Sequence, residues 1–417
     1  MTWFACLVLS LIFLKWAVQL WLEWLNARNV RAHSGSVPEH LREVVDDATY
    51  SRTVQYTLAK GRLREIELTY DSLLLVVVLF SGILPWALGG LRSVLGASTW
   101  AMACFLFIIG VALSILDLPF EWYAQFRLEE RFGFNTTTQK LWWIDRVKGL
   151  CLSVLLGYPL LVLILFLVQT TGRLWWLWAW AVLMIFQLVM AVLAPVLIMP
   201  LFNKFTPLPE GSLRERLLRL AGRTSFRAKS IQLMDGSKRS RHSNAFFTGF
   251  GRFRKIVLFD TLVQQLLESE LEAVLAHEIG HYKKKHLLKM LIAAAFGSLA
   301  GFYLLSWLAR QDWFYRTFGL PPGNFAAGLL VFGMLSGTVS FWLSPLLHWW
   351  SRRYEYQADG FAAQTIGTSD PLIAALRKLS EKNLSNLTPH PLYSAFYYSH
   401  PTLLERQAAL AQLKPEG

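Results

Sequence analysis

Residues 277–281 read His-Glu-Ile-Gly-His, and this H-E-x-x-H stretch is the most informative part of the chain. The hydrophobic pattern around it predicts a helix, and Ser269 with Glu272 gives the capping box expected at its start. Positions i and i+4 of a helix share one face, so both imidazoles can reach one metal ion. Glu278 is placed to take a proton from water that the metal activates.

A catalytic zinc site has three protein ligands and keeps a fourth position for water. A third histidine six residues after the second is one zinc-peptidase pattern, but that position is Leu287. His286 falls one residue short, and we interpret it as an interfacial polar residue in a Lys-rich turn. The remaining option is a glutamate from a separate helix. Glu355 and Asp359 share a helix face, which favours Glu355 as ligand and Asp359 as a partner of an imidazole N–H over a merely solvated acidic face.

The composition is that of a membrane protein, since 54% of the 417 residues are hydrophobic and 18 are tryptophan. Lys15 interrupts the first apolar run, which we interpret as an uncleaved span rather than a signal peptide. The last two spans separate His281 from Glu355, so the chain returns to the same membrane side and the two motifs can meet. Seven runs are long enough to cross a bilayer, at residues 2–25, 72–91, 99–118, 150–168, 174–197, 287–309 and 325–349.

The net charge of +13 is unevenly distributed. Basic residues gather in the loops at 26–70 and after the third span, and the alternate loops are poor in them. The positive-inside rule then places the N-terminus outside, and residues 203–286 and the C-terminal tail in the cytoplasm. No aromatic-interleaved basic module indicates nucleic-acid binding. The three cysteines lie in apolar spans and form neither a disulfide framework nor a zinc pattern.

We expect a small extended element beside the motif. Residues 230–234 and 254–259 read as strands, 244–247 as a third extended piece, and 213–221 as a helix. Gly249 and Gly251 mark a turn before the second strand, and a sheet edge could bind a substrate as an added strand. This divides the chain into 1–202 with five membrane helices, 203–286 with the first catalytic segment, 287–350 with two membrane helices and 351–417 with the third ligand.

With these residues in place, the chain resembles the integral-membrane zinc endopeptidases of the CAAX prenyl protease type 1 family, the a-factor-converting-enzyme class. The resemblance covers nearly the whole length, and the order and spacing of the short motifs make it specific. The matching stretches are 118–120, 129–135, 200–208, 242–249, 277–281, 355–359 and 399–401 with Arg406.

The resemblance implies a ligand set and a fold. His277, His281 and Glu355 match the ligands of one Zn²⁺ per chain, and Glu278 matches the general base. The fold of this family is all-α and polytopic, with seven membrane helices forming a barrel around a chamber. A gluzincin-type metalloprotease core with a small β element holds the zinc at the cytoplasmic end.

Four further roles come from the resemblance. Asn244 matches an asparagine on the strand where the substrate backbone is expected to lie. Asp359 and Arg406 match positions that support the ligands. His400 matches a histidine thought to stabilise the oxyanion, a role that suits a positioned imidazole donor.

The implied function is hydrolysis of C-terminal, CAAX-like or membrane-associated polypeptides in the lipid bilayer. One alternative is a heat-shock-type membrane quality-control protease, which would have fewer spans. Another is a non-enzymatic chamber for lipid-linked peptides, which would have no need for Glu278. The chain is richer in Arg than in Lys and ends without an ER-retention signal, so we expect a bacterial inner-membrane member. We infer no oligomeric state.

Overall fold

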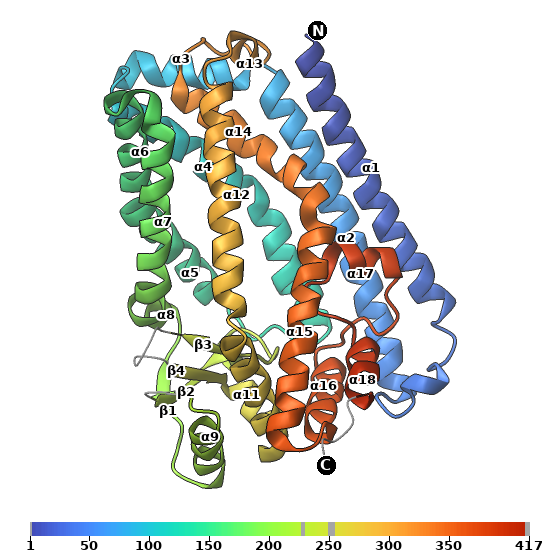
Figure 1. The fold of residues 1–417 in the computed structure, drawn as a ribbon. Helices are drawn as coiled ribbons and strands as arrows, with labels where there is room; N and C mark the ends of the chain where they lie inside the picture. Colours follow the sequence, from blue (N-terminus) through green and yellow to red (C-terminus); the bar gives the residue numbers. More distant parts are fainter. Residues whose placement is uncertain (1, 227–229, 249–254, 413–417) are drawn as a thin grey trace.

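The computed structural model describes residues 2–226, 230–248 and 255–412, and most of them are helical (Figure 1). Six continuous helical segments are long and apolar enough to cross a membrane, and a bent helix pair makes up to seven. The expected all-α polytopic fold is therefore confirmed. The membrane part contains α1 (Trp3–Ala32), α2 (Asp47–Phe80), α3 (Ile83–Leu95), α4 (Thr99–Tyr123), α5 (Gln139–Leu152), α6 (Tyr158–Thr170), α7 (Trp175–Leu193), α8 (Met199–Phe202), α12 (His286–Leu308), α13 (Asp312–Arg316), α14 (Phe325–Ser340) and α15 (Ser344–Ile366).

The second predicted span is not one straight helix. The apolar run at 72–91 breaks at residues 81–82, and α2 and α3 meet there at an angle of 57°. Gly82 adopts a left-handed conformation with φ 87°, and Pro85 lies in the first turn of α3, where its missing N–H costs no helical hydrogen bond. Hydropathy reports only burial in an apolar phase, so it could not show this bend.

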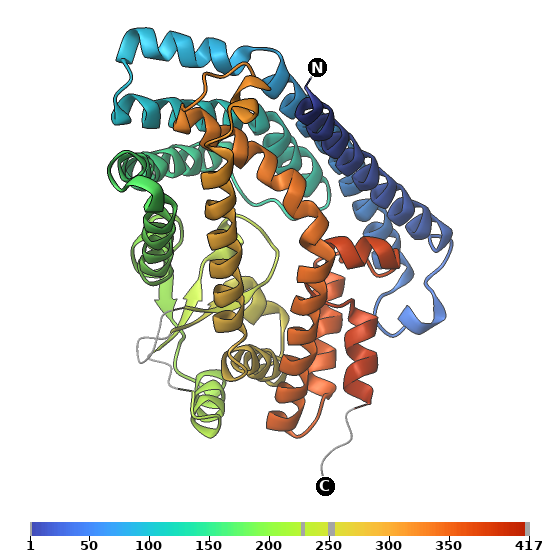
Figure 2. The same cartoon turned by 45° about the horizontal axis from the view of Figure 1, so that its top comes forward.

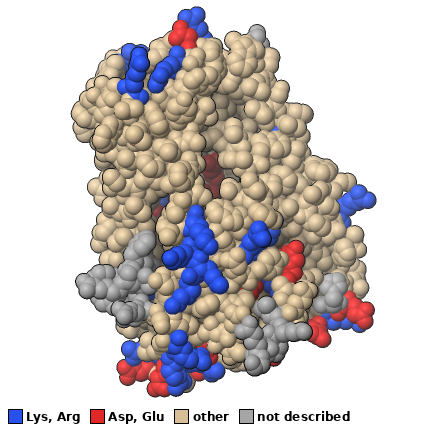
Figure 3. Space-filling model, in the orientation of Figure 1, with Lys and Arg blue, Asp and Glu red and all other residues tan. Residues whose placement is uncertain are grey.

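The spans are arranged with much of their surface free of protein contacts. In the apolar 18-residue stretch that qualifies each of these segments as a span, at most a third of the residues are buried within the structure. Figures 1 and 2 show α1 and α2 side by side on one flank and α6 and α7 on the other, with α12 and the α14–α15 segment between them. A broad band of the surface in Figure 3 is nearly free of charged side chains, and an opening within it exposes acidic atoms in its depth.

A cavity of about 280 Å³ lies between these spans, with both apolar and ionisable side chains in its lining. Lys15 of α1, Asp71 of α2 and Asp117 of α4 contribute to its wall. Ionisable groups in membrane helices favour water-filled spaces over lipid, which accounts for their position on the wall of this cavity.

The catalytic part forms a small lobe at the end of the molecule opposite the N-terminus (Figure 1). It has one four-stranded sheet in the order β1-β2-β4-β3, in which β2 and β4 are parallel and the two outer strands antiparallel. Its elements are β1 (Phe205–Pro207), α9 (Ser212–Arg223), β2 (Ser230–Met234), β3 (Ala245–Thr248), β4 (Lys255–Phe259), α10 (Asp260–Gln265), α11 (Glu268–Lys283), α16 (Asp370–Lys382), α17 (Pro391–Tyr397) and α18 (Leu403–Ala411).

The three strands and the helix predicted for this lobe are present, and their ends differ from the prediction by no more than two residues. Strand β1 was not predicted, because its three residues have no alternating pattern and gain their pairing from β2. The turn at Gly249 and Gly251 lies outside the described residues.

One hydrophobic core holds the lobe together. It includes Leu217 of α9, Ile256 of β4, Ile279 of α11 and Ala362 of α15, together with Leu372 of α16. Segments on both sides of the last two spans therefore contribute to one packed unit, and this packing fixes α15 against α11.

Candidate metal centre

Helix α11 presents the two histidines of the motif. It begins two residues earlier than predicted, with Leu267 rather than Ser269 as the cap, because the carboxylate of Glu270, rather than that of Glu272, accepts the Leu267 N–H at 2.8 Å. Glu272 is instead paired with Arg216 and Arg223 of α9. The expectation of a Ser269–Glu272 capping box is therefore wrong, since long-range ion pairs take the glutamate away from the helix terminus.

Helices α11 and α15 cross at very short range. A Cβ atom at Gly280, inside the H-E-x-x-H stretch, would lie 3.0 Å from the Cα of Ala358. That distance is below ordinary van der Waals contact, so a larger residue would push the helices apart. The glycine therefore sets how closely the helix with the histidines approaches the helix with Glu355 and Asp359.

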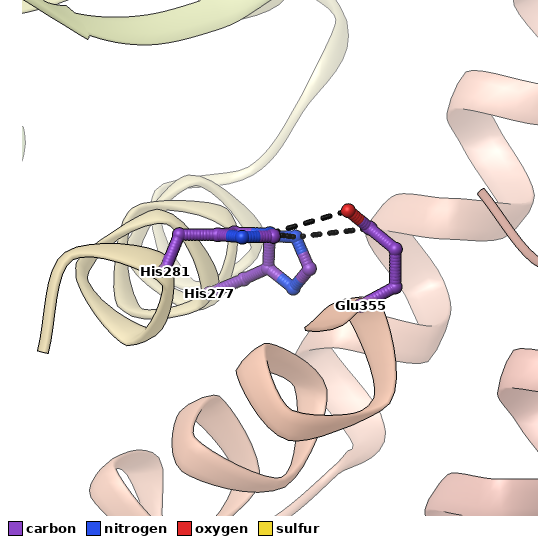
Figure 4. Close-up of side chains that lie close together, drawn as sticks. All are labelled: His277, His281 and Glu355. Carbon is purple, nitrogen blue, oxygen red and sulfur yellow. Dashed lines mark hydrogen bonds and ion pairs between the residues drawn. The ribbon is translucent and has the colours of Figure 1, made fainter. Parts of the chain in front are cut away.

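His277, His281 and Glu355 converge at this crossing (Figure 4). The Nε2 atoms of the two histidines lie 3.2 Å apart. One carboxylate oxygen of Glu355 lies 3.5 Å from His277 Nε2, and the other lies 3.3 Å from His281 Nε2. A tetrahedral zinc with bonds of about 2.0–2.1 Å separates its ligand atoms by roughly 3.3–3.4 Å. The three side chains therefore have the chemistry and spacing of one face of a tetrahedral metal site.

Asp359 and Arg406 hold the first histidine. Asp359 lies one helical turn beyond Glu355 and places its Oδ1 2.7 Å from His277 Nδ1. The guanidinium of Arg406, from α18, donates to both oxygens of that carboxylate at 2.8 and 2.5 Å. All of these groups are buried. The Asp359 carboxylate fixes the ring so that Nε2 is directed toward the other two ligand atoms.

The electrostatics at His277 favour positive charge. Burial disfavours the protonated imidazole, but hydrogen bonds to Asp359 and Glu355 outweigh it and raise the pKa of His277 to about 9. Two nearby carboxylates thus create a place where a cation is stabilised, and a divalent metal ion fulfils that requirement.

His286 holds the second histidine, a role the sequence did not indicate. Its Nε2 lies 3.0 Å from Gln357 Oε1, and its Nδ1 lies 3.1 Å from His281 Nδ1. If Gln357 accepts from Nε2–H, the Nδ1 of His286 is an acceptor, and His281 must donate its Nδ1–H. That tautomer leaves the Nε2 lone pair of His281 free for a metal. The ring also stacks on Tyr354, with centroids 4.0 Å apart.

The interpretation of His286 as an interfacial polar residue is therefore incomplete: the residue begins α12, but it is only 1% exposed and is hydrogen-bonded within the protein. Lys285 adopts a left-handed conformation with φ 57° between α11 and α12, and this reversal turns the next side chain back toward the site. No pattern in the local sequence signals such a turn at a lysine.

Replacing His286 by alanine should weaken metal affinity by about 10–100-fold, the usual effect of removing a partner that orients a metal ligand. The ligands would all remain, but the tautomer of His281 would no longer be fixed. Competition with a chromophoric chelator measures the affinity. His33, exposed at the end of α1, serves as the matched histidine, and an equal loss in His33→Ala would remove this role from His286.

Glu278 and His400 lie at the same site but are not among the three converging groups. Burial raises the pKa of the Glu278 carboxyl above its ordinary value. His400 is 65% exposed at its side chain, and its Nδ1 is 2.8 Å from Glu355 Oε2. An exposed imidazole beside a metal ligand can reach a bound substrate, although the contact to Glu355 occupies one of its nitrogens in this conformation.

Asn244 directly precedes β3, the edge strand of the sheet. Its backbone carbonyl accepts the Phe259 N–H at 3.1 Å, which joins the start of β3 to the end of β4. Its own side chain is exposed and accepts the Ala245 N–H at 2.8 Å. Among the described strands, β3 pairs only with β4, so its other edge can pair with an extended peptide.

Two further motifs meet at the start of that edge strand. Tyr56 donates to Glu129 at 2.6 Å, and the other oxygen of Glu129 lies 3.3 Å from His242 Nε2. The His242 ring stacks on Phe134 at 4.2 Å and contacts Asn383 through Nδ1 at 3.1 Å. Glu129 and His242 are 113 positions apart, and their contact fixes the loop that carries Asn244 to the segment after the third span.

The fold and this site define an integral-membrane metallopeptidase. Comparison with family models supports this class over almost the whole chain. The model for the N-terminal domain of CAAX prenyl proteases, with five membrane helices, matches residues 26–204, and that for peptidase family M48 matches residues 207–414. The chain belongs to the CAAX prenyl protease group of peptidase family M48, and it is a metalloendopeptidase.

Individual relatives agree with this assignment. The chain is 39% identical to a CAAX prenyl protease 1 homolog of Arabidopsis thaliana, with 90% of each chain covered. It is 38% identical to CAAX prenyl protease 1 of Saccharomyces cerevisiae, covering 90% of this chain and 88% of that protein. The crystal structure of Ste24p from S. mikatae matches 98% of this chain and 99% of its own, with a TM-score of 0.92 at 32% identity.

Proposed function

We propose that the chain is a zinc-dependent endopeptidase in which His277, His281 and Glu355 bind the metal. The observation that carries the proposal is the spacing of 3.2–3.5 Å among their nitrogen and oxygen atoms. Two imidazoles and one carboxylate are a common ligand set for catalytic zinc. A bound zinc ion supplies a Lewis acid that polarises the scissile carbonyl and acidifies water.

Side chains of the protein carry out the other steps of peptide hydrolysis. The Glu278 carboxylate takes a proton from the attacking water and delivers it to the leaving amine. The His400 imidazole donates a hydrogen bond to the oxygen that gains negative charge. The free edge of β3 and Asn244 hold the peptide extended, while Asp359 and Arg406 keep the first ligand in place.

For the substrate, we propose the C-terminal segment of CAAX-like or membrane-associated polypeptides. The support comes from the named relatives, which are CAAX prenyl proteases matched over at least 88% of their length. The match to the five-helix N-terminal domain favours this substrate class over that of a heat-shock-type quality-control protease.

A peptide assay tests this function. The purified protein should release the terminal tripeptide from a farnesylated CAAX peptide, and mass spectrometry should detect one zinc per chain. A chelator should abolish release and zinc should restore it. Cleavage of a membrane-inserted control peptide at an equal rate, with no preference for the CAAX end, would exclude specificity for CAAX-like ends and leave membrane-associated polypeptides as the substrate class.

Replacement of His400 by alanine should lower kcat by about 10²-fold, the usual effect of losing one oxyanion donor. KM and zinc content should change little, because the donor acts only as negative charge develops. Steady-state kinetics with parallel metal analysis measures both. An empty metal site in this variant would make His400 a ligand, and unchanged turnover would exclude it from the reaction.

We further propose that the metal site faces the cytoplasm. The support is the basic character of the loops at the catalytic end of the molecule. Labelling of single cysteines introduced at Gly96, Asn135 and Pro322 should report Asn135 inside and the other two outside. The reverse pattern would place the site on the outer face.

For the membrane, we propose a bacterial inner membrane. This rests on the Arg-rich composition, and the relatives named above are eukaryotic and lend it no support. Fractionation of the source cells tests it.

A further inference from the structure

A groove of about 570 Å³ runs between α2 and α4, where the two helices leave the apolar part of the molecule. None of its lining residues belongs to the metal site. Apolar side chains form its walls, including Ile66, Phe120 and Tyr123, and three arginines, Arg62, Arg127 and Arg131, line it as well. We propose that this groove binds an anionic phospholipid, with the phosphate on the arginines and an acyl chain along the apolar wall.

The groove lies on the outer side of α2. Ala59, Arg62 and Ile66 are spaced i, i+3 and i+7, so they share one face of the helix. Lys60 and Arg64, which line the cavity between α2 and the C-terminal segment, belong to another face. Two residues of a helix separate side chains by about 200°, so Arg62 and Arg64 are directed to opposite sides. Leu63 and Leu128 line both the groove and that cavity, so they form the wall between the two, and the groove lies on the other side of this wall.

Depth along the helices also fits a lipid. Pro119 follows directly after the third apolar run, and Arg127 lies eight residues beyond it, about 12 Å along a helix. Arg62 lies about 6 Å beyond Ile66 on the same scale. Arg127 and Arg62 are thus both farther from the apolar runs than Phe120 and Ile66. The apolar wall is the end of the groove nearer the hydrocarbon, and the arginines are at its polar end, which is the order of the acyl chain and the phosphate in a phospholipid.

The three arginines are free to bind an anion. Within the described residues none of them forms an ion pair with an acidic side chain, whereas neighbouring Arg64 and Arg146 pair with Glu67 and Glu121. Arg127 lies over the ring of Trp122 at 5.7 Å, a contact that orients the guanidinium and leaves its N–H groups available. Guanidinium groups bind phosphate in a bidentate manner, and basic pockets at span ends are known lipid sites.

Native mass spectrometry of the delipidated full chain tests the proposal. Titration with phosphatidylglycerol should show one lipid bound at least about tenfold more tightly than phosphatidylcholine with the same acyl chains. The triple variant Arg62→Gln/Arg127→Gln/Arg131→Gln should lose about 10²-fold in affinity for phosphatidylglycerol, since each arginine near an anionic headgroup contributes about fivefold. Affinity for phosphatidylcholine should stay the same.

A matched control removes three arginines elsewhere on the same end of the membrane part: Arg28→Gln/Arg31→Gln/Arg42→Gln. It should bind phosphatidylglycerol like the unmodified chain. An equal loss in the control would mean general attraction to a basic surface and would overturn the site, as would unchanged binding in the groove variant. Because the triple variant could fail to fold, Ile66→Glu is the second test. Ile66 is 59% exposed, and a carboxylate there should repel the headgroup and lower affinity at least about fivefold.

Discussion

The Glu278→Gln protein should retain its metal and lose peptide hydrolysis by about 10³–10⁴-fold in kcat/KM, the upper part of the range for general acid–base catalysis. The amide has nearly the shape of the carboxylate but cannot accept a proton from water. Glu278 is not one of the three converging ligand groups, so the metal should stay bound. Cleavage of a farnesylated CAAX peptide, followed by mass spectrometry of the tripeptide, measures the loss.

This experiment has two controls: the metal content of the variant and the replacement of a second glutamate. Inductively coupled plasma mass spectrometry should find the same zinc per chain in the variant and the unmodified protein. Glu215→Gln, an exposed glutamate of α9 in the same lobe, should keep full activity. Hydrolysis at the original rate by Glu278→Gln would assign the proton transfer to another group.

The Glu355→Ala protein should lose metal affinity by more than about 10²-fold, beyond the loss typical of an outer partner. Glu355 provides the only carboxylate among the three converging groups, and its removal leaves two imidazoles from one helix. Isothermal titration with zinc and metal analysis after dialysis measure the effect, and hydrolysis should fall with occupancy.

Two further variants provide comparisons for this loss of metal affinity. Asp359→Asn, which alters only the partner of His277, should lose less, about 10–100-fold. Glu210→Ala, on the exposed loop before α9, should bind zinc normally. Near-full occupancy in Glu355→Ala would remove Glu355 from the ligand set and would reopen the choice of the third ligand.

Local sequence was sufficient for features that depend on local spacing. The apolar runs identified the spans, because hydropathy over about 20 residues is a property of the segment itself. The i and i+4 positions of His277 and His281 indicated a shared helix face, and Glu355 with Asp359 did the same. Counting spans between the two motifs correctly predicted that they could meet.

Features that depend on contacts between distant segments could not be predicted in this way. The bend at Gly82 and the reversal at Lys285 are single backbone conformations, and neither alters the hydrophobic pattern. The role of His286 depends on a contact to Gln357, 71 positions later. The capping expectation at Glu272 was wrong because arginines from α9 bind that side chain.

The sequence by itself therefore determined the membrane class, the two motifs whose side chains converge and most of the small sheet. Only the tertiary structure decided how these parts combine. It showed that Gly280 lets α11 and α15 approach, that His286 orients His281, and that β3 is an edge strand fixed through His242 and Glu129. The physical reason is that periodicity and hydropathy record the environment of each segment, whereas orientation of a ligand ring depends on hydrogen bonds and close packing between segments distant in the chain.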